Sequence, residues 1–132
     1  MIKLVATDID GTFIKADRSF DVAKFEKILS RMKEIDCDFV VSSGNQYYQL
    51  KKMFADYGNE ISVVSDNGAY VEFRGEFIFA ADIPKKIVID VTKICKNFAD
   101  ISLFLFGVKS AYVQRDLLKP EVLNFMQKYV PR

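Results

Sequence analysis

Two aspartates one residue apart are the side chains of this sequence best suited to chemistry. Asp8 and Asp10 follow a short apolar run and precede Gly11 in the stretch LVATDIDGTFIK. In an extended strand, side chains two residues apart point to the same face, so the two carboxylates are expected to converge about 6 to 7 Å apart. Like charges at that separation favour a bound cation, and Mg²⁺ accepts one or two carboxylates while it also binds substrate phosphate. The pair therefore predicts a Mg²⁺ site that handles phosphate.

Two further polar clusters follow later strands. The stretch SSGN at 42–45 precedes a predicted helix, so a hydroxyl and successive N–H groups at a helix N-terminus are expected to bind phosphate. The stretch SDNG at 65–68 follows a third strand. Each cluster alone is an ordinary turn sequence. Because ligands bind beyond the carboxyl ends of parallel strands, their order predicts one site that also contains Asp8 and Asp10. The aromatic pair Tyr47-Tyr48 is interpreted as packing.

The elements that must position these residues alternate between strand and helix. The run IKLVAT is expected to be a strand buried on both faces. Ser19 or Asp21 can cap the helix that follows. This βαβαβ order predicts a doubly wound, Rossmann-like parallel sheet of the α/β class with right-handed crossovers. The predicted elements are strand 2–7, a helix to about residue 35, strand 38–42, a helix ending at Gly58 and strand 60–65.

After residue 65 the pattern changes. Two short alternating segments meet at Arg74-Gly75, which predicts a hairpin. Beyond Pro84 the pattern indicates a helix, a pair of strands and a closing helix. This order predicts a separate layer or small cap, so residues 1–82 are assigned to the core and residues 83–132 to the first part of an α+β cap. The three cap elements are expected at 85–98, at 101–115 and at about 120–129.

Composition excludes several functions. The 132 residues include 19 Lys and Arg against 18 Asp and Glu, a balance that attracts neither nucleic acid nor a membrane surface. The absence of histidine excludes imidazole bases, Ser-His-Asp triads and the usual zinc sites. Cys37 and Cys95 are far apart and are expected to be reduced, as in the cytoplasm. No signal peptide is recognised, and no apolar run approaches the roughly 18 residues of a membrane span.

Three motifs together resemble those of a known superfamily. DIDGT at 8–12 resembles the first motif of the haloacid dehalogenase (HAD) superfamily of phosphohydrolases, and VVSSGN at 40–45 resembles the second. SDNGA at 65–69, followed by a hairpin, is similar to the Cof-like subfamily, which inserts an α/β cap after the third strand. The resemblance implies a Mg²⁺-dependent phosphatase that acts on small phosphorylated metabolites such as sugar phosphates.

The resemblance also implies roles for individual residues. Asp8 would be the nucleophile that forms an aspartyl-phosphate. Asp10 would protonate the leaving alkoxide and then deprotonate the hydrolytic water. Mg²⁺ would be bound by the Asp8 carboxylate and the Asp10 carbonyl oxygen. The residues expected to contact phosphate are Ser43, Gly44, Gly11, Asn45 and Asn67.

The sequence also departs from the family pattern. The family uses a later lysine and a Gly-Asp-x-x-x-Asp segment, but none of the six glycines here is followed by aspartate. The chain therefore resembles an amino-terminal portion of such an enzyme, and weak Mg²⁺ binding and feeble activity are expected of it alone. The first strand, which is central in the family sheet, is expected to leave a bare edge that favours a homo-oligomer.

Two alternatives remain open at this point. One is a non-catalytic phosphate-binding or assembly module that awaits a partner chain. The other is a response-regulator receiver, in which Asp66 would accept the phosphoryl group. The predicted hairpin and the separation of Asp8 from Asp10 by Ile9 weigh against a receiver. The resemblance implies that the cap sets the substrate.

Overall fold

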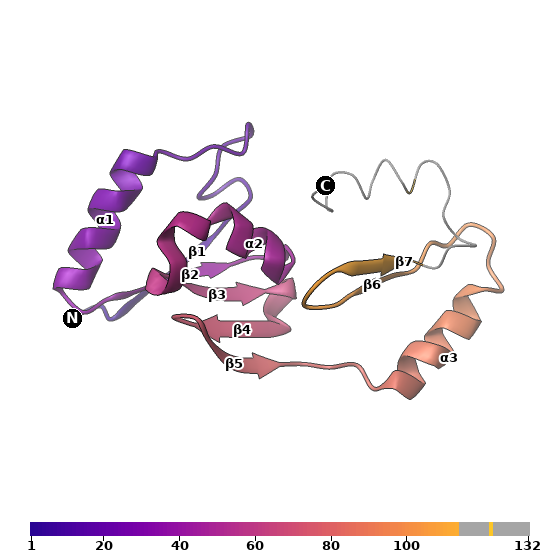
Figure 1. Ribbon diagram of the computed structural model, residues 1–132. Helices are drawn as coiled ribbons and strands as arrows, with labels where there is room; N and C mark the ends of the chain where they lie inside the picture. The colour runs from indigo at the N-terminus through magenta and orange to yellow at the C-terminus, as the bar shows by residue number, and fades with distance from the viewer. Residues whose placement is uncertain (114–121, 123–132) are drawn as a thin grey trace. The chain divides into compact units, whose positions relative to one another are not determined.

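A computed structural model describes residues 1–113 and residue 122. The chain divides into two compact units, Met1–Ala80 and Ala81–Arg132. The first unit contains a five-stranded sheet with two α-helices, and the second contains a helix and a two-stranded sheet (Figure 1). Each unit is described by itself below.

The sheet of the first unit is parallel in its first half and antiparallel in its second. The strands lie in the order β1-β2-β3-β4-β5, which is also their order in the sequence (Figure 1). β1 to β3 are parallel, whereas β4 and β5 form the predicted antiparallel hairpin and extend the same sheet. This mixed sheet confirms the α/β class. The strands are β1 Leu4–Asp8, β2 Asp38–Ser42, β3 Ser62–Ser65, β4 Tyr70–Phe73 and β5 Glu76–Ala80.

The register of the parallel strands brings their carboxyl ends together. Asp8, the last residue of β1, pairs with Ser42, the last residue of β2. Ser42 in turn pairs with Val64, one residue before the end of β3. The three polar segments that follow these strands therefore start at the same edge of the sheet, as expected.

The helices begin where the sequence indicates, but one ends early. In α1, Val22–Glu34, the Asp21 carboxylate accepts a hydrogen bond of 3.0 Å from the Lys24 N–H and caps the helix. α2 covers only Tyr47–Met53 and continues as a 3₁₀ segment, Ala55–Glu60. Gly58 within that segment has a φ of 52°, a conformation incompatible with a continuing α-helix.

Both helices pack on the same face of the sheet. Residues from α1 and α2 share one buried cluster with Phe39, Val41 and Val63. Both crossover helices of the first unit therefore lie on one face of the sheet, as in one half of a doubly wound sheet. The reason is that β1, β2 and β3 are added in one direction, so crossovers of the same hand place both helices on the same side. The helical members of the cluster are Phe25, Leu29, Met32 and Leu50.

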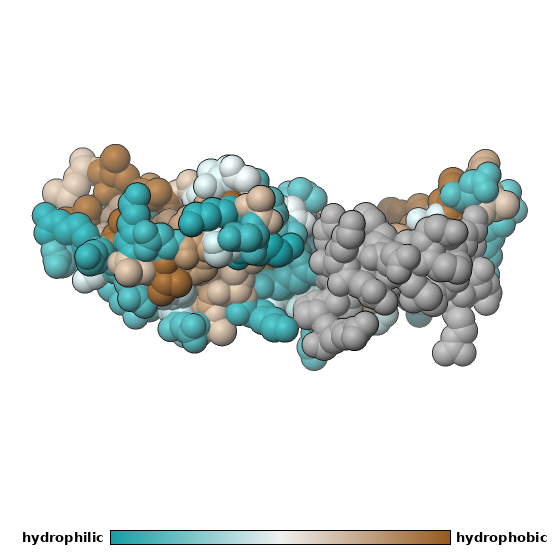
Figure 2. All heavy atoms as spheres, turned by 90° about the horizontal axis from the view of Figure 1, so that it is seen from above, coloured by the Kyte–Doolittle hydropathy of each residue, from teal (hydrophilic) through white to brown (hydrophobic). Residues whose placement is uncertain are grey.

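The expectation that the first strand is buried on both faces is wrong. β1 is an edge strand that pairs only with β2, and Leu4 and Val5 are 52% and 40% exposed. Its position at the edge explains this exposure, because one side of β1 has no neighbouring strand in the described part of the chain. Apolar residues, drawn in brown, reach the surface at several places in Figure 2. Within the described residues, the edge of β1 that the sequence predicts to be bare pairs with no second strand.

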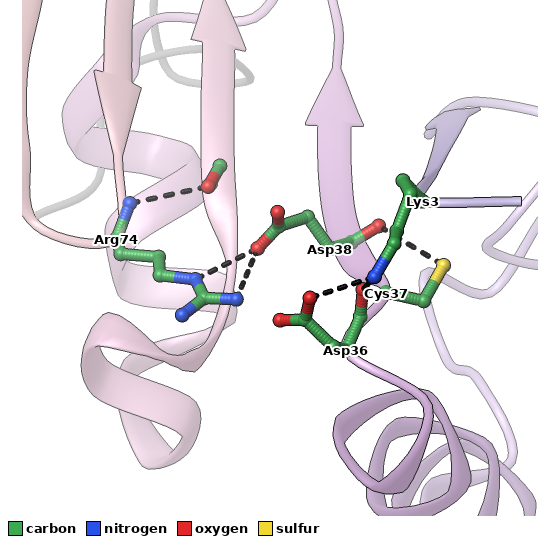
Figure 3. A network of polar contacts seen from close by, with 6 residues as sticks. Lys3, Asp36, Cys37, Asp38 and Arg74 are labelled. Atoms are coloured by element: carbon green, nitrogen blue, oxygen red, sulfur yellow. Dashed lines mark hydrogen bonds and ion pairs between the residues drawn. The ribbon is translucent and has the colours of Figure 1, made fainter.

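A polar network ties the sheet together at the end opposite the polar segments (Figure 3). Asp38, the first residue of β2, accepts a hydrogen bond of 2.7 Å from Nε of Arg74 at the hairpin turn. The Arg74 N–H donates to the Ser62 hydroxyl at 3.1 Å. Nearby, Lys3 Nζ lies 2.7 Å from Asp36 Oδ2, and this hydrogen bond lowers the pKa of the Asp36 carboxyl. The two Arg74 contacts fix the hairpin beside β3, at the end of the sheet opposite the polar segments.

The second unit begins with α3, Lys85–Cys95, and continues with the antiparallel pair β6, Phe104–Phe106, and β7, Ala111–Val113. These elements match the predicted helix and strand pair. The predicted closing helix at about 120–129 lies outside the described residues. In the part of the chain that the structure describes, no helix is long and apolar enough to cross a membrane.

Candidate active site

The two aspartates lie on either side of a buried residue. Asp8 and Asp10 are exposed, whereas Ile9 between them is completely buried in the core. The turn closes when the Ile14 N–H donates to the Ile9 carbonyl at 3.0 Å. Gly11 has a φ of 77°, which side-chain-bearing residues rarely adopt, so it permits the turn through its backbone conformation. The alternation of exposed and buried residues places both carboxylates away from the core.

A cavity of about 520 Å³ opens at the carboxyl ends of β1 and β2. It contains four of the predicted site residues, including the proposed nucleophile. The Thr12 hydroxyl donates to Asp8 Oδ2 at 3.4 Å, which holds the carboxylate from the turn side. Ala6, Thr7 and Ser42 were not among the predicted site residues. The cavity is lined by Ala6, Thr7, Asp8, Ser42, Ser43, Gly44 and Asn67.

The loop after β2 is hydrogen-bonded to the loop after β3. The Ser43 N–H donates to the Val64 carbonyl at 2.9 Å, and the Asn67 N–H donates to the Ser43 carbonyl at 3.4 Å. The Asp66 N–H donates to the Asn45 carbonyl at 3.0 Å. These backbone contacts fix the position of the Ser43 hydroxyl and of Asn67 relative to each other.

The loop after β3 has an unusual backbone. Asp66, Asn67 and Gly68 have φ values of 52°, 56° and 91°, so three successive residues are in the left-handed region. Asp and Asn are among the non-glycine residues that adopt it most readily. This turn brings Asn67 so close to Gly44 that a Cβ atom at Gly44 would lie 2.8 Å from Asn67 Oδ1. A side chain at position 44 would therefore displace the Asn67 amide.

Asp10 and Asn45 are joined directly. Asn45 Nδ2 donates to Asp10 Oδ2 at 2.6 Å, across 35 positions of sequence. The structure thus brings together Asp8, Ser43, Gly44 and Asn67 in the cavity, and pairs Asp10 with Asn45 beside them. The phosphate contact expected of Asn45 stays a prediction, and one of its amide hydrogens is already engaged by Asp10.

The helix N-terminus expected to bind phosphate is occupied by a side chain. α2 begins at Tyr47, and the Tyr47 N–H donates to Asp66 Oδ2 at 3.3 Å. Asp66 therefore takes one N–H of the first helical turn, and the expectation that phosphate binds at the loop before this helix stays a prediction. Among the described residues, neither the Ser43 hydroxyl nor the Gly44 N–H has an acceptor of its own, so both can donate to phosphate.

Sequence reasoning missed a buried ionic network behind the site. Glu72 on β4 is only 5% exposed, and its carboxylate accepts hydrogen bonds from the Tyr47 hydroxyl and, at 2.8 Å, from Lys51 Nζ. Burial, together with the hydrogen bond and charge of Glu72, raises the pKa of the Tyr47 hydroxyl above its usual range. Tyr47 and Lys51 belong to α2, so the network fixes this helix against the hairpin. Strand alternation places Glu72 on the same face as Tyr70, whose ring centroid lies 4.5 Å from that of Tyr47.

The oxygen atoms at the site suit a hard cation that is bound weakly. Within the described residues, no group of three or more His, Cys, Asp or Glu side chains could hold a metal ion. Asp8 supplies a carboxylate in the cavity, and Asp10 supplies oxygen atoms beside it. Mg²⁺ commonly binds proteins through one or two carboxylates and keeps several waters. The residues present therefore fit Mg²⁺ in a site that solvent and phosphate complete.

The fold agrees with comparisons to known proteins. Residues 5–130 match the model of the haloacid dehalogenase-like hydrolases. The chain belongs to this family. It is 35% identical over 111 residues to the 5-amino-6-(5-phospho-D-ribitylamino)uracil phosphatase YbjI of Escherichia coli, an alignment that covers 84% of this chain and 41% of that protein. The receiver alternative is therefore set aside.

Solved structures show the same fold. The crystal structure of SMU.1108c from Streptococcus mutans is 27% identical, with a TM-score of 0.86 over 99% of this chain and 49% of that one. The HAD subclass IIB sugar phosphatase BT4131 is 18% identical, with a TM-score of 0.71 over 96% of this chain and 48% of that one. The chain thus spans less than half the length of these relatives.

Proposed function

We propose that these residues form the nucleophile and phosphate-binding part of a Mg²⁺-dependent phosphoric monoester hydrolase. The observation that supports this most directly is the shared cavity of Asp8, Ser43 and Gly44 at the ends of two parallel strands. A carboxylate nucleophile suits phosphoryl transfer, in which positioning and charge neutralisation matter more than a strong base. Membership of a hydrolase family whose curated relatives include phosphatases agrees with this chemistry.

The reaction is proposed to proceed in two steps. An Asp8 carboxylate oxygen attacks phosphorus, the ester P–O bond breaks, and the leaving alkoxide takes a proton from Asp10. Asp10, now a carboxylate, takes a proton from water as the water oxygen attacks the aspartyl-phosphate and releases inorganic phosphate. Asp8 is thereby regenerated as a carboxylate, and Asp10 as an acid. Both side chains are exposed and therefore accessible to substrate and water.

The phosphoryl oxygens are proposed to lie between the loops after β1 and β2. The Ser43 hydroxyl and the Gly44 N–H supply donors, and Gly11 and Asn67 complete the contacts, whereas the Asn45 side chain is engaged by Asp10. Bound by the Asp8 carboxylate and the Asp10 carbonyl oxygen, Mg²⁺ supplies positive charge that offsets the phosphoryl oxygens. The nucleophile, the acid and base, and the hydrogen-bond donors to phosphate are groups of this chain.

The substrate class proposed is a small phosphorylated metabolite such as a sugar phosphate. The name of the Escherichia coli relative specifies a phosphorylated ribityl compound, and BT4131 is titled a sugar phosphatase. Cys37 and Cys95 are not bonded to each other. Together with the near balance of 19 basic and 18 acidic residues, this supports a cytoplasmic enzyme without a nucleic-acid or membrane partner.

Removal of divalent metal tests this proposal. The complete product of the gene is expected to hydrolyse p-nitrophenyl phosphate and sugar phosphates in Mg²⁺, and to lose at least about 100-fold in rate in EDTA, because a metal that offsets phosphoryl charge contributes several kcal/mol. Excess Mg²⁺ is expected to restore the rate. The 132-residue chain alone is expected to need a high Mg²⁺ concentration. The reason is that Asp8 is the one carboxylate among the described residues that line this cavity, so the metal is bound weakly. Hydrolysis that is unchanged by EDTA would contradict the proposal.

We also propose that the chain self-associates through the edge of β1. Leu4 is 52% exposed on this edge strand, and bare strands recruit partners. Light scattering of the 132-residue chain at micromolar concentration is expected to give the molar mass of a dimer or larger species. Leu4→Lys is expected to lower this molar mass toward that of a monomer. Ile28→Lys, an equivalent change at a residue of α1 that is 44% exposed, serves as the control. A monomeric mass for the unsubstituted chain would refute the idea.

A further inference from the structure

We propose that Asn45 is a positioning residue that orients Asp10 for its proton transfers. This inference rests on the proposed function, in which Asp10 is the general acid and base. Its structural basis is the hydrogen bond of 2.6 Å from Asn45 Nδ2 to Asp10 Oδ2. The bond joins the loop after β2 to the loop after β1, so it fixes Asp10 relative to the strand end that carries the Ser43 hydroxyl.

Asn45 itself is held firmly. Its backbone N–H donates to the Ser43 hydroxyl at 3.1 Å, and its carbonyl accepts from the Asp66 N–H at 3.0 Å. Asp66 is fixed in turn, because its carboxylate accepts from the Tyr47 N–H. Since both backbone groups of Asn45 are engaged, the side-chain amide is presented from a rigid support.

Asp10 needs such a partner because nothing else in the described residues restrains its carboxylate. It is exposed and lies in a turn, where its side chain could otherwise sample several rotamers. The Asn45 amide engages Oδ2 and leaves Oδ1 available to exchange a proton with the leaving group and with water. A neutral amide orients the carboxylate without adding a full positive charge beside it. The Asn45 amide is therefore suited to positioning Asp10 and not to neutralising its charge.

The dependence of the rate on the leaving group tests this role. An alkoxide needs a proton as it leaves, whereas p-nitrophenolate departs as an anion. The rates are measured in single turnovers with protein in excess, which follow only formation of the aspartyl-phosphate. Under these conditions, Asn45→Ala in the complete gene product is expected to lower the rate with a sugar phosphate at least about 10-fold. The same variant is expected to change the single-turnover rate with p-nitrophenyl phosphate by less than about 3-fold. Asn45→Asp, similar in shape but without a donor, is expected to behave like Asn45→Ala or worse.

Controls separate this inference from the proposed function. Asn97→Ala, at an exposed position that follows α3, is expected to leave both substrates unaffected. An equal loss of rate on both substrates in Asn45→Ala would overturn the positioning role, because it would indicate a contact with the phosphoryl group or a structural defect. Asp8→Asn is expected to abolish both reactions. Full activity in Asp8→Asn would instead refute the proposed function itself.

A measurement without catalysis provides a second readout. The side-chain amide protons of Asn45, assigned by their loss in Asn45→Ala, are expected to resonate downfield in a ¹H–¹⁵N spectrum because one of them donates to a carboxylate. In Asp10→Ala this proton is expected to move upfield, while backbone amides outside the two loops stay in place. An Asn45 amide that does not respond to Asp10→Ala would contradict the hydrogen bond on which the inference depends.

Discussion

Replacement of Asp8 by asparagine is expected to reduce phosphate ester hydrolysis by at least about 1,000-fold. The change keeps the size of the side chain at the end of β1, where it lines the cavity with Ser43 and Gly44. Asparagine retains an oxygen that can accept from the Thr12 hydroxyl. It loses the anionic oxygen that attacks phosphorus and the charge that binds Mg²⁺. The effect is measured as kcat/KM on p-nitrophenyl phosphate and on a sugar phosphate.

Two controls accompany this variant. Asp56→Asn, which removes an exposed carboxylate elsewhere in the first unit, is expected to leave kcat/KM unchanged. Acid-quenched wild-type protein is expected to carry a phosphoryl group on the peptide that contains Asp8, and Asp8→Asn is expected to carry none. A phosphoryl group on Asp66 would instead support a receiver-like reaction. A fully active Asp8→Asn variant would remove the basis of the proposed function.

Replacement of Lys51 by methionine is expected to lower the free energy of unfolding by about 2 to 4 kcal/mol. The Lys51 ammonium lies 2.8 Å from Glu72 Oε1, and the two side chains are 31% and 6% exposed. Without Lys51, the buried Glu72 carboxylate keeps only the Tyr47 hydroxyl as a partner among the described residues. The partial exposure of Lys51 places the expected cost at the lower part of the range for a broken buried pair. Urea unfolding measured by circular dichroism reports the change.

Lys52→Met provides the matched comparison, because Lys52 is the exposed neighbour of Lys51 on the same helix. Its effect is expected to stay within about 0.5 kcal/mol. The double variant Lys51→Met with Glu72→Leu is expected to recover part of the lost stability, since it no longer buries an unpaired charge. If Lys51→Met and Lys52→Met destabilise equally, the network contributes nothing beyond surface packing.

Much of the site was predictable because it depends on the ends of strands. The apolar runs before Asp8, Ser42 and Asp66 indicate parallel strands, and their shared direction places the following polar residues on one edge. The Asp21 cap and the hairpin at Arg74-Gly75 depend equally on local sequence, and both are confirmed. Such features are predictable because residues close together in the sequence determine them.

The errors arise where long-range contacts decide. The composition of β1 resembles that of a buried strand, yet its exposure depends on which strands lie beside it. The N-terminus of α2 looks free in the sequence, but Asp66, 19 residues later, accepts from the Tyr47 N–H. Tyr47 was assigned to packing alone because the burial of its partner Glu72 follows only from the pairing of β4 with β3. No local pattern contains that information.

The left-handed turn at 66–68 has a consequence for how the pocket assembles. Asp66 and Asn67 each hold a conformation that disfavours most residues by roughly 1 kcal/mol or more. The contacts of Asp66 with Asn45 and Tyr47 help to hold the turn in this conformation. The position of Asn67 in the cavity therefore depends on the contacts that its neighbour Asp66 makes with the loop after β2 and with α2.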